Sequence, residues 1–106
     1  MMHKDLAAGR WQELSLAEQM AHIGSEVSRA VSWKAKNRPD QSRCALERAL
    51  ELTDLTLAGL KDGPRLKEIA RSREVLVDYF MDANSYGSTS DLLCRYYDVF
   101  AFAIRK

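Results

Sequence analysis

Apolar residues recur every three or four positions in four separate stretches of this chain, and this spacing constrains the fold most strongly. At about 100° per residue, positions spaced in this way share one face of an α-helix. The first stretch follows Ser15-Leu16-Ala17-Glu18, a sequence typical of a capping box at a helix N-terminus. Its apolar positions are Leu16, Met20, Ile23, Val27 and Val31. Small residues border this stripe, among them Ala17, Ala21, Gly24 and Ser28, and we expect them to let a neighbouring helix come close.

Turn signals separate the four stretches. Pro39 disfavours helix geometry in the residue before it, Gly63-Pro64 is typical of one helix ending and another beginning, and residues 82–87 have turn chemistry. We expect Asp40 to cap the second helix and residues 88–91 to cap the fourth. The expected buried stripes are Leu46, Ala49, Leu50, Thr53, Leu57 and Leu60; then Leu66, Ile69, Ala70, Leu76, Val77 and Phe80; then Leu92, Leu93, Tyr96, Val99, Phe100 and Ala103.

The pattern predicts an all-α protein, an antiparallel up-and-down bundle of about four helices. Short connections favour antiparallel neighbours. The 106 residues are enough for one core to hold the fold together without metal or disulfides. We therefore expect a single helical-bundle domain over residues 1–106, with residues 1–14 as a leader segment.

The charge and cysteine content exclude several classes of protein. The net charge is +1, from 16 basic and 15 acidic residues, and exerts no bulk attraction toward nucleic acid or membrane. No apolar run approaches the roughly 20 residues of a membrane span, and the first residues do not resemble a signal peptide. Cys44 and Cys94 stand outside any paired motif, and the Glu18–His22 pair offers too few metal ligands. We expect a cytoplasmic protein with reduced thiols, no cofactor, no metal and no membrane contact.

Arg73 falls in the middle of the apolar stripe of the third helix, between Ile69 and Leu76. A charge in that position is costly unless it is paired and hydrogen-bonded. One interpretation is a buried salt bridge to the first two helices, with candidate partners Glu26, Glu47, Glu51 and Asp54. The alternative is that Arg73, with Asp78 nearby, faces a cleft that binds an anion.

Several large apolar residues fall outside the main stripes. The residues that we expect to contact a partner are Trp33, Leu52, Leu55, Tyr79 and Phe102. Large uncovered apolar patches are uncommon on monomers, so the surplus favours a homo-oligomer or a protein partner, with a symmetric dimer as the simplest form. For Trp33 an equal alternative is packing against apolar residues of the leader segment.

Basic residues cluster in two places. Lys34, Lys36, Arg38 and Arg43 surround the first turn, and Arg65, Lys67, Arg71 and Arg73 lie in the third helix. If the two regions meet, Arg38, Arg43, Lys67 and Arg71 would contact RNA phosphates. The alternative is a solvated face, because acidic residues three or four positions away neutralise the third-helix bases.

The stretch Arg71-Ser72-Arg73-Glu74-Val75-Leu76-Val77-Asp78-Tyr79-Phe80 resembles the motif helix of HEPN domains. These are small helical bundles, often RNases or partners of nucleotidyltransferases. Active members carry an arginine followed four to six residues later by a histidine. Arg73 matches the arginine, whereas Asp78 and Tyr79 stand where the histidine is expected, which puts cleavage in doubt.

Two further resemblances concern the whole chain. Its size and layout are similar to those of the small four-helix proteins encoded in ribosomal RNA intervening sequences, whose relatives assemble as oligomers. The remaining pattern, including Asn84-Ser85-Tyr86-Gly87, resembles uncharacterised bacterial helical proteins.

The sequence therefore favours a small helical interaction module that self-associates or docks on a protein or RNA partner. Nucleophilic catalysis has little support, because no Gly-x-Ser-x-Gly, phosphate loop or cysteine beside a base occurs. The alternative is a degenerate HEPN-like RNase, with Asp78 in place of the histidine, or a nucleotidyltransferase partner. A role without catalysis is the favoured hypothesis.

Overall fold

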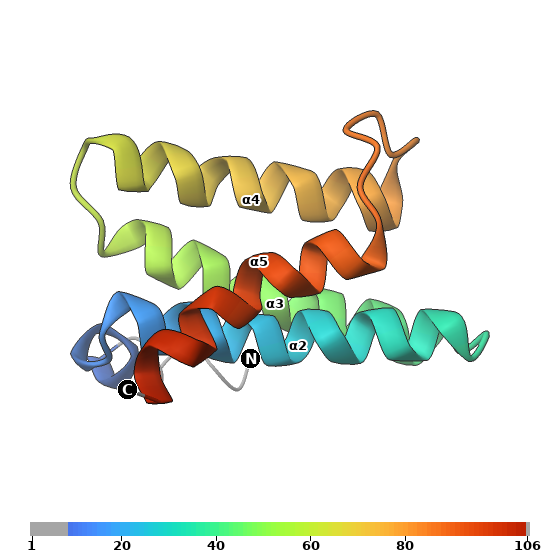
Figure 1. Ribbon diagram of the computed structural model, residues 1–106, viewed down its shortest axis with the longest axis horizontal. Coiled ribbons are helices and arrows are strands. Elements are labelled where there is room, and N and C mark those ends of the chain that lie inside the picture. The colour runs from blue at the N-terminus through green and yellow to red at the C-terminus, as the bar shows by residue number, and fades with distance from the viewer. Residues whose placement is uncertain (1–8, 106) are drawn as a thin grey trace.

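The computed structural model describes residues 9–105, and every regular element in that range is helical. Four long helices follow a short helical segment at residues 9–13 (Figure 1). They are α2 (Leu16–Ala35), α3 (Pro39–Ala58), α4 (Pro64–Met81) and α5 (Ser90–Arg105). The all-α prediction is confirmed.

Local capping explains where the helices begin. The predicted capping box is present at α2, where the Glu18 N–H donates to Ser15 Oγ (3.1 Å) and the Ser15 N–H donates to Glu18 Oε1 (2.8 Å). At α5 the Leu92 N–H donates to Thr89 Oγ1 at 3.2 Å. The expected cap at Asp40 is wrong, because α3 already begins at Pro39, whose fixed φ suits the first helical position.

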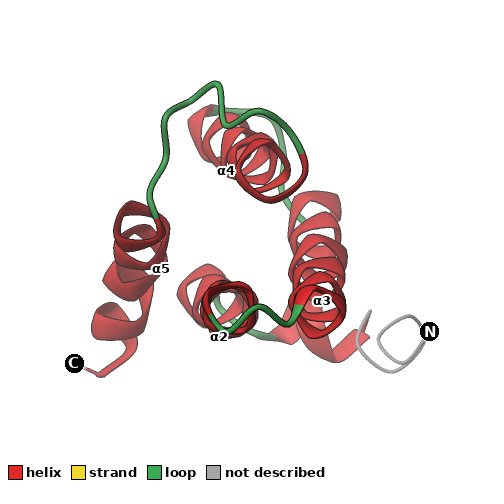
Figure 2. Ribbon diagram, turned by 90° about the vertical axis from the view of Figure 1, so that its right-hand side faces the viewer, coloured by secondary structure: helices red, strands yellow, loops and turns green. Residues whose placement is uncertain are grey.

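The core is centred on α2. Met20, Ile23 and Val27 are completely buried. Helix α2 packs against α3 on one side and α5 on the other, and α4 lies across from it (Figure 2). The other helices contribute the buried side chains Ala45, Leu46, Ala49, Leu52, Ile69, Leu76, Leu93 and Tyr97.

Part of the expected leader segment belongs to this core. Trp11 is only 6% exposed, and its indole Nε1–H donates to Thr56 Oγ1 of α3 at 2.9 Å. The Gln19 side-chain amide donates to the Trp11 carbonyl at 2.7 Å. Thr56 in turn donates to the Leu52 carbonyl, so this buried polar group is satisfied. Residues 1–8 lie outside the described part of the chain.

Helices α2 and α5 approach each other closely at Gly24. A Cβ added there would lie 2.5 Å from the Cβ of Tyr97, closer than real Cβ atoms come. The expected close approach along the small-residue border of α2 is therefore confirmed at Gly24. Tyr97 is 3% exposed as a result.

This contact corrects the buried face predicted for α5. Leu93 and Tyr97 turn toward the core, whereas Leu92, Val99 and Ala103 are exposed. The expected burial of those three residues is wrong, because apolar side chains occupy most of the circumference of α5. The sequence pattern alone did not determine which side packs.

We expect Gly24→Ala to lower the free energy of unfolding by about 1–3 kcal/mol, the usual cost of overpacking. Alanine ordinarily stabilises a helix interior by about 1 kcal/mol relative to glycine, so a loss would come from the contact with Tyr97. Chemical denaturation would measure it. Gly9→Ala is the control, since a Cβ there meets nothing within 4 Å. Stabilisation by Gly24→Ala would contradict the close contact.

Candidate functional site

An uncovered apolar face runs along α5. Of the six large hydrophobic side chains exposed among the described residues, four lie on this helix: Leu92 (55%), Val99 (65%), Phe102 (62%) and Ile104 (44%). Leu92, Val99 and Ala103 fall within about 40° of one another around the helix axis, so they form one stripe. We call Leu92, Val99, Phe102 and Ala103 the α5 face.

The α5 face borders a groove between α5 and its neighbours. The Tyr96 hydroxyl donates to Glu68 Oε2 of α4 at 2.9 Å and divides the groove into two hollows. One, of about 280 Å³, is lined by Val75 of α4 and by Leu92 and Tyr97 of α5. The other, of about 410 Å³, is lined by Leu16 of α2 and by Val99, Phe100 and Ala103 of α5. Most of the lining is apolar.

The tyrosine hydroxyls beside this groove stay protonated. Burial raises the pKa of the Tyr97 hydroxyl, and burial together with the hydrogen bond to Glu68 raises the pKa of Tyr96. Burial, and then the charges of Asp98 and Asp91, raise the pKa of the Cys94 thiol. Tyr96 therefore remains a hydrogen-bond donor, and neither tyrosine hydroxyl nor the Cys94 thiol is activated as a nucleophile.

Only one of the five residues expected to contact a partner lies on this face. Phe102 is 62% exposed, whereas Leu55, Tyr79 and Trp33 are half-buried. The expectation for Leu52 is wrong, since it is 5% exposed and part of the core. The short N-terminal segment explains the burial of Leu52, because this segment packs on α3. It is held there by the Trp11–Thr56 hydrogen bond and by a 2.8 Å hydrogen bond from the Gln12 side-chain amide to the Leu55 carbonyl.

Trp33 does not pack against the described part of the leader segment. Trp11 lies beside His22, with ring centroids 5.9 Å apart, and His22 is about 16 Å along the helix from Trp33. The ammonium of Lys36 instead sits 5.4 Å from the Trp33 ring centroid. Trp33 is thus part of the end of the molecule formed by the α2–α3 turn.

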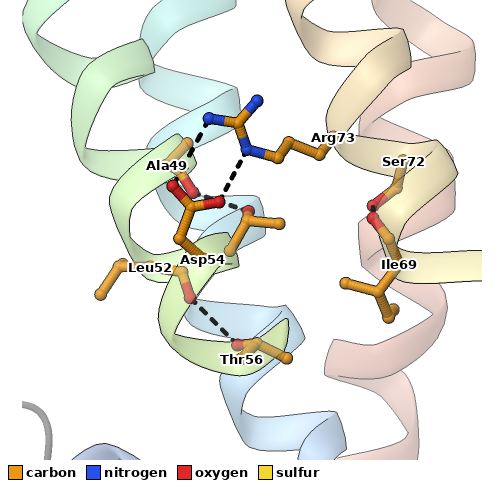
Figure 3. Close-up of polar contacts among 8 residues, drawn as sticks. Ala49, Leu52, Asp54, Thr56, Ile69, Ser72 and Arg73 are labelled. Atoms are coloured by element: carbon orange, nitrogen blue, oxygen red, sulfur yellow. Dashed lines mark hydrogen bonds and ion pairs between the residues drawn. The ribbon is translucent and has the colours of Figure 1, made fainter. Parts of the chain in front are cut away.

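Arg73 pairs with Asp54, one of the four partners considered from the sequence (Figure 3). Its Nε–H donates to Asp54 Oδ1 at 2.7 Å and its Nη2–H donates to Oδ2 at 3.4 Å. The pair is not buried as expected, since the side chains are 37% and 57% exposed. It joins α3 and α4 at the molecular surface, where water solvates both charges.

Asp78 makes hydrogen bonds to the backbone and does not pair with Arg73. It is 7% exposed, and its carboxylate accepts the backbone N–H of Ser85 (2.8 Å) and of Tyr86 (3.0 Å). It therefore anchors the α4–α5 connection to the end of α4. Five residues apart on a helix, Arg73 and Asp78 point about 140° from each other, so they do not form one anion site. The signal for this anchor was a carboxylate one turn before a helix end and a turn-forming segment.

The two basic clusters do not meet. Arg43 lines a hollow beside Phe80 and Met81 at the C-terminal end of α4, and Arg38 is the N-cap of α3. Arg71 lines the α4–α5 groove, about 13 Å along α4 from Phe80, and Lys67 is a turn further away. The single phosphate-binding patch expected from all four residues is therefore not assembled.

Residues 9–105 hold neither a grouped set of metal-binding side chains nor a helix that could cross a membrane. No three His, Cys, Asp or Glu side chains within this range are placed to hold a metal ion. Nor does any helix in this range have the length and apolar character needed to cross a membrane. His3 lies outside the described residues.

Comparison of the chain with known protein families, with curated proteins and with solved structures finds no match. The proposals below therefore depend on the geometry alone.

We expect Asp78→Ala to destabilise the fold by about 1–3 kcal/mol, because it leaves two backbone N–H groups without an acceptor. Asp78→Asn keeps one acceptor oxygen and should cost less. Thermal unfolding of the two variants would rank them. Equal stability of wild type and Asp78→Ala would show that the carboxylate does not hold the connection.

A double-mutant cycle on Arg73 and Asp54 should give a coupling energy of about 0.2–1 kcal/mol, the range for exposed ion pairs. Arg73→Ala, Asp54→Ala and the double variant would be compared by urea denaturation, with high salt reducing the coupling. A coupling of several kcal/mol would mean that the pair is buried after all.

Proposed function

We propose that this protein is a non-catalytic helical interaction module that self-associates through the α5 face. The observation that carries the proposal is the exposure of Leu92, Val99 and Phe102 on one helix. Fully burying a side chain of this kind contributes about 1.5–3 kcal/mol, so covering a stripe of them is a substantial driving force. Contiguous exposed apolar surface typically marks a site of protein contact.

The shape of the α5 face favours a second copy of the chain as its occupant. A two-fold interface must be complementary to itself. If two α5 helices pack antiparallel about a two-fold axis between Tyr96 and Val99, then Leu92 of each copy lies opposite Ala103 of the other. A large side chain then meets a small one at both ends of the stripe, which suits close packing.

The charges beside the stripe are complementary in the same arrangement. Arg95 and Asp98 both lie on the flank next to Phe102 and make no ion pair with any described residue. In the antiparallel pairing, Arg95 of each copy comes within one helical turn of Asp98 of the other. Two symmetric ion pairs would thus frame the apolar stripe and select this register over others.

We also propose that the four long helices form an antiparallel up-and-down bundle and that the protein works in the cytoplasm. The connections between the long helices have three, five and eight residues, lengths typical of antiparallel neighbours. The colour gradient in Figure 1 reverses its direction at each connection. Cys44 and Cys94 are free thiols, as is usual in a reducing compartment.

Val99→Asp should convert an oligomer into a monomer, because it places two like charges near the proposed two-fold axis. Sedimentation equilibrium at increasing concentration would measure the mass of the wild type and the variant. Since Val99 is 65% exposed, its replacement should leave the thermal unfolding of the monomer within about 0.5 kcal/mol of the wild type.

Met81→Asp is the matched control, because it adds the same charge at a side chain of α4 that is 52% exposed. It should leave the mass unchanged. A wild type that stays monomeric at its highest soluble concentration contradicts the proposal. So does an oligomer that survives Val99→Asp but not Met81→Asp, which would move the interface to another surface.

A further inference from the structure

A third hollow lies where the α2–α3 turn meets the C-terminal end of α4. Its volume is about 410 Å³. Its lining combines polar side chains, among them Lys34, Asn37 and Arg43, with the apolar side chains of Leu46, Phe80 and Met81. Helices α2, α3 and α4 each contribute to it, so the hollow is formed by the fold and not by one loop.

Positive charge gathers around this hollow without being neutralised. Lys34, Lys36, Arg38 and Arg43 make no ion pair with any residue of the described range. Asp40 is the one acidic residue in the lining, and Asp82 follows Met81 in sequence. Lys34 and Arg43 are the two cations of the lining, and they attract an anion.

The charge of Lys34 is held in place. Its ammonium lies 4.7 Å from the ring centroid of Tyr79 and 5.6 Å from that of Phe80. Both distances fall within the range of cation–π attraction. Because the Lys34 side chain is already held in this way, it loses less conformational entropy when an anion binds.

The hollow is larger than an inorganic anion requires. Its volume falls in the range of about 300–1,000 Å³ that is typical of small-molecule sites. Phe80 is half-buried and Met81 is 52% exposed, so the apolar wall is open to a ligand. A ligand with a negative group and a flat or apolar body would match both kinds of lining residue.

We propose that this hollow binds a nucleotide, with Lys34 and Arg43 on the phosphate and the apolar wall of Phe80 and Met81 against the base. Asn37 offers an amide that both donates and accepts hydrogen bonds at the rim. The same chemistry fits a free nucleotide or one unit of a single-stranded RNA. The site is independent of the α5 face, so either proposal can fail while the other holds.

The test titrates the full chain with four probes: inorganic phosphate, adenosine, adenosine 5′-monophosphate and a short single-stranded oligoribonucleotide. Calorimetry gives the affinities, and backbone amide NMR shows whether Asn37, Asp40 and Arg43 respond. We expect the monophosphate to bind more tightly than phosphate or adenosine alone. Binding of the oligoribonucleotide without binding of the monophosphate also supports the site and identifies RNA as the source of the nucleotide.

Variants of the hollow make the test specific. Lys34→Gln should weaken binding about tenfold or more, as for a lost charge-assisted hydrogen bond, and Arg43→Gln should act similarly. Asp40→Asn removes the one opposing charge in the lining and should strengthen binding by up to about fivefold. Lys67→Gln, an exposed lysine elsewhere on α4, is the matched control and should change nothing.

Three outcomes would overturn the proposal. The first is the absence of any amide response to all four probes. The second is equal affinity for phosphate and the monophosphate, which removes the role of the apolar wall. The third is an equal loss of binding in Lys34→Gln and Lys67→Gln, which would reveal diffuse attraction to surface charge.

Discussion

The contact between Gly24 of α2 and Tyr97 of α5 sets the rotation of the last helix, and with it the surface of the protein. Tyr97 fits over a position without a side chain, which brings the two helices close and turns Leu93 inward with it. Because α5 is apolar around most of its circumference, any rotation would leave some apolar residues outside. The rotation fixed at Gly24 leaves Leu92, Val99 and Phe102 outside, and the interaction proposal rests on these three residues.

Helix α4 is held by side chains that reach across to its neighbours. Arg73 reaches Asp54 of α3, and Glu68 accepts the hydroxyl of Tyr96 of α5. Ile69 and Leu76 supply its buried contacts with the core. The separation of α4 from its neighbours leaves room for the α4–α5 groove beside the α5 face and for the hollow at the C-terminal end of α4. One feature of the packing therefore accounts for both candidate sites.

The helices could be predicted from the sequence because their signals are local. The Ser15–Glu18 box and the 3–4 spacing of Met20, Ile23 and Val27 act within one helix and are seen in the structure. Apart from the cap expected at Asp40, the errors concern contacts that form only when the chain folds. Leu52 is buried because the segment of Trp11 covers α3, and the exposure of the Arg73–Asp54 pair depends on where α3 and α4 diverge. Asp78 was noticed as a charge near Arg73, whereas its partners are backbone groups that only the folded connection supplies.

Hydrogen–deuterium exchange of the wild-type chain at low and high concentration tests the central claim most directly, namely that α5 packs on its own core with one side and on a second copy with the other. We predict that exchange at residues 92–103 slows as the concentration rises, because association protects the helix from local opening. Exchange at residues 43–55 of α3 should not change. Exchange along α5 that is independent of concentration, or a slowing that appears in α3 instead, would contradict the account.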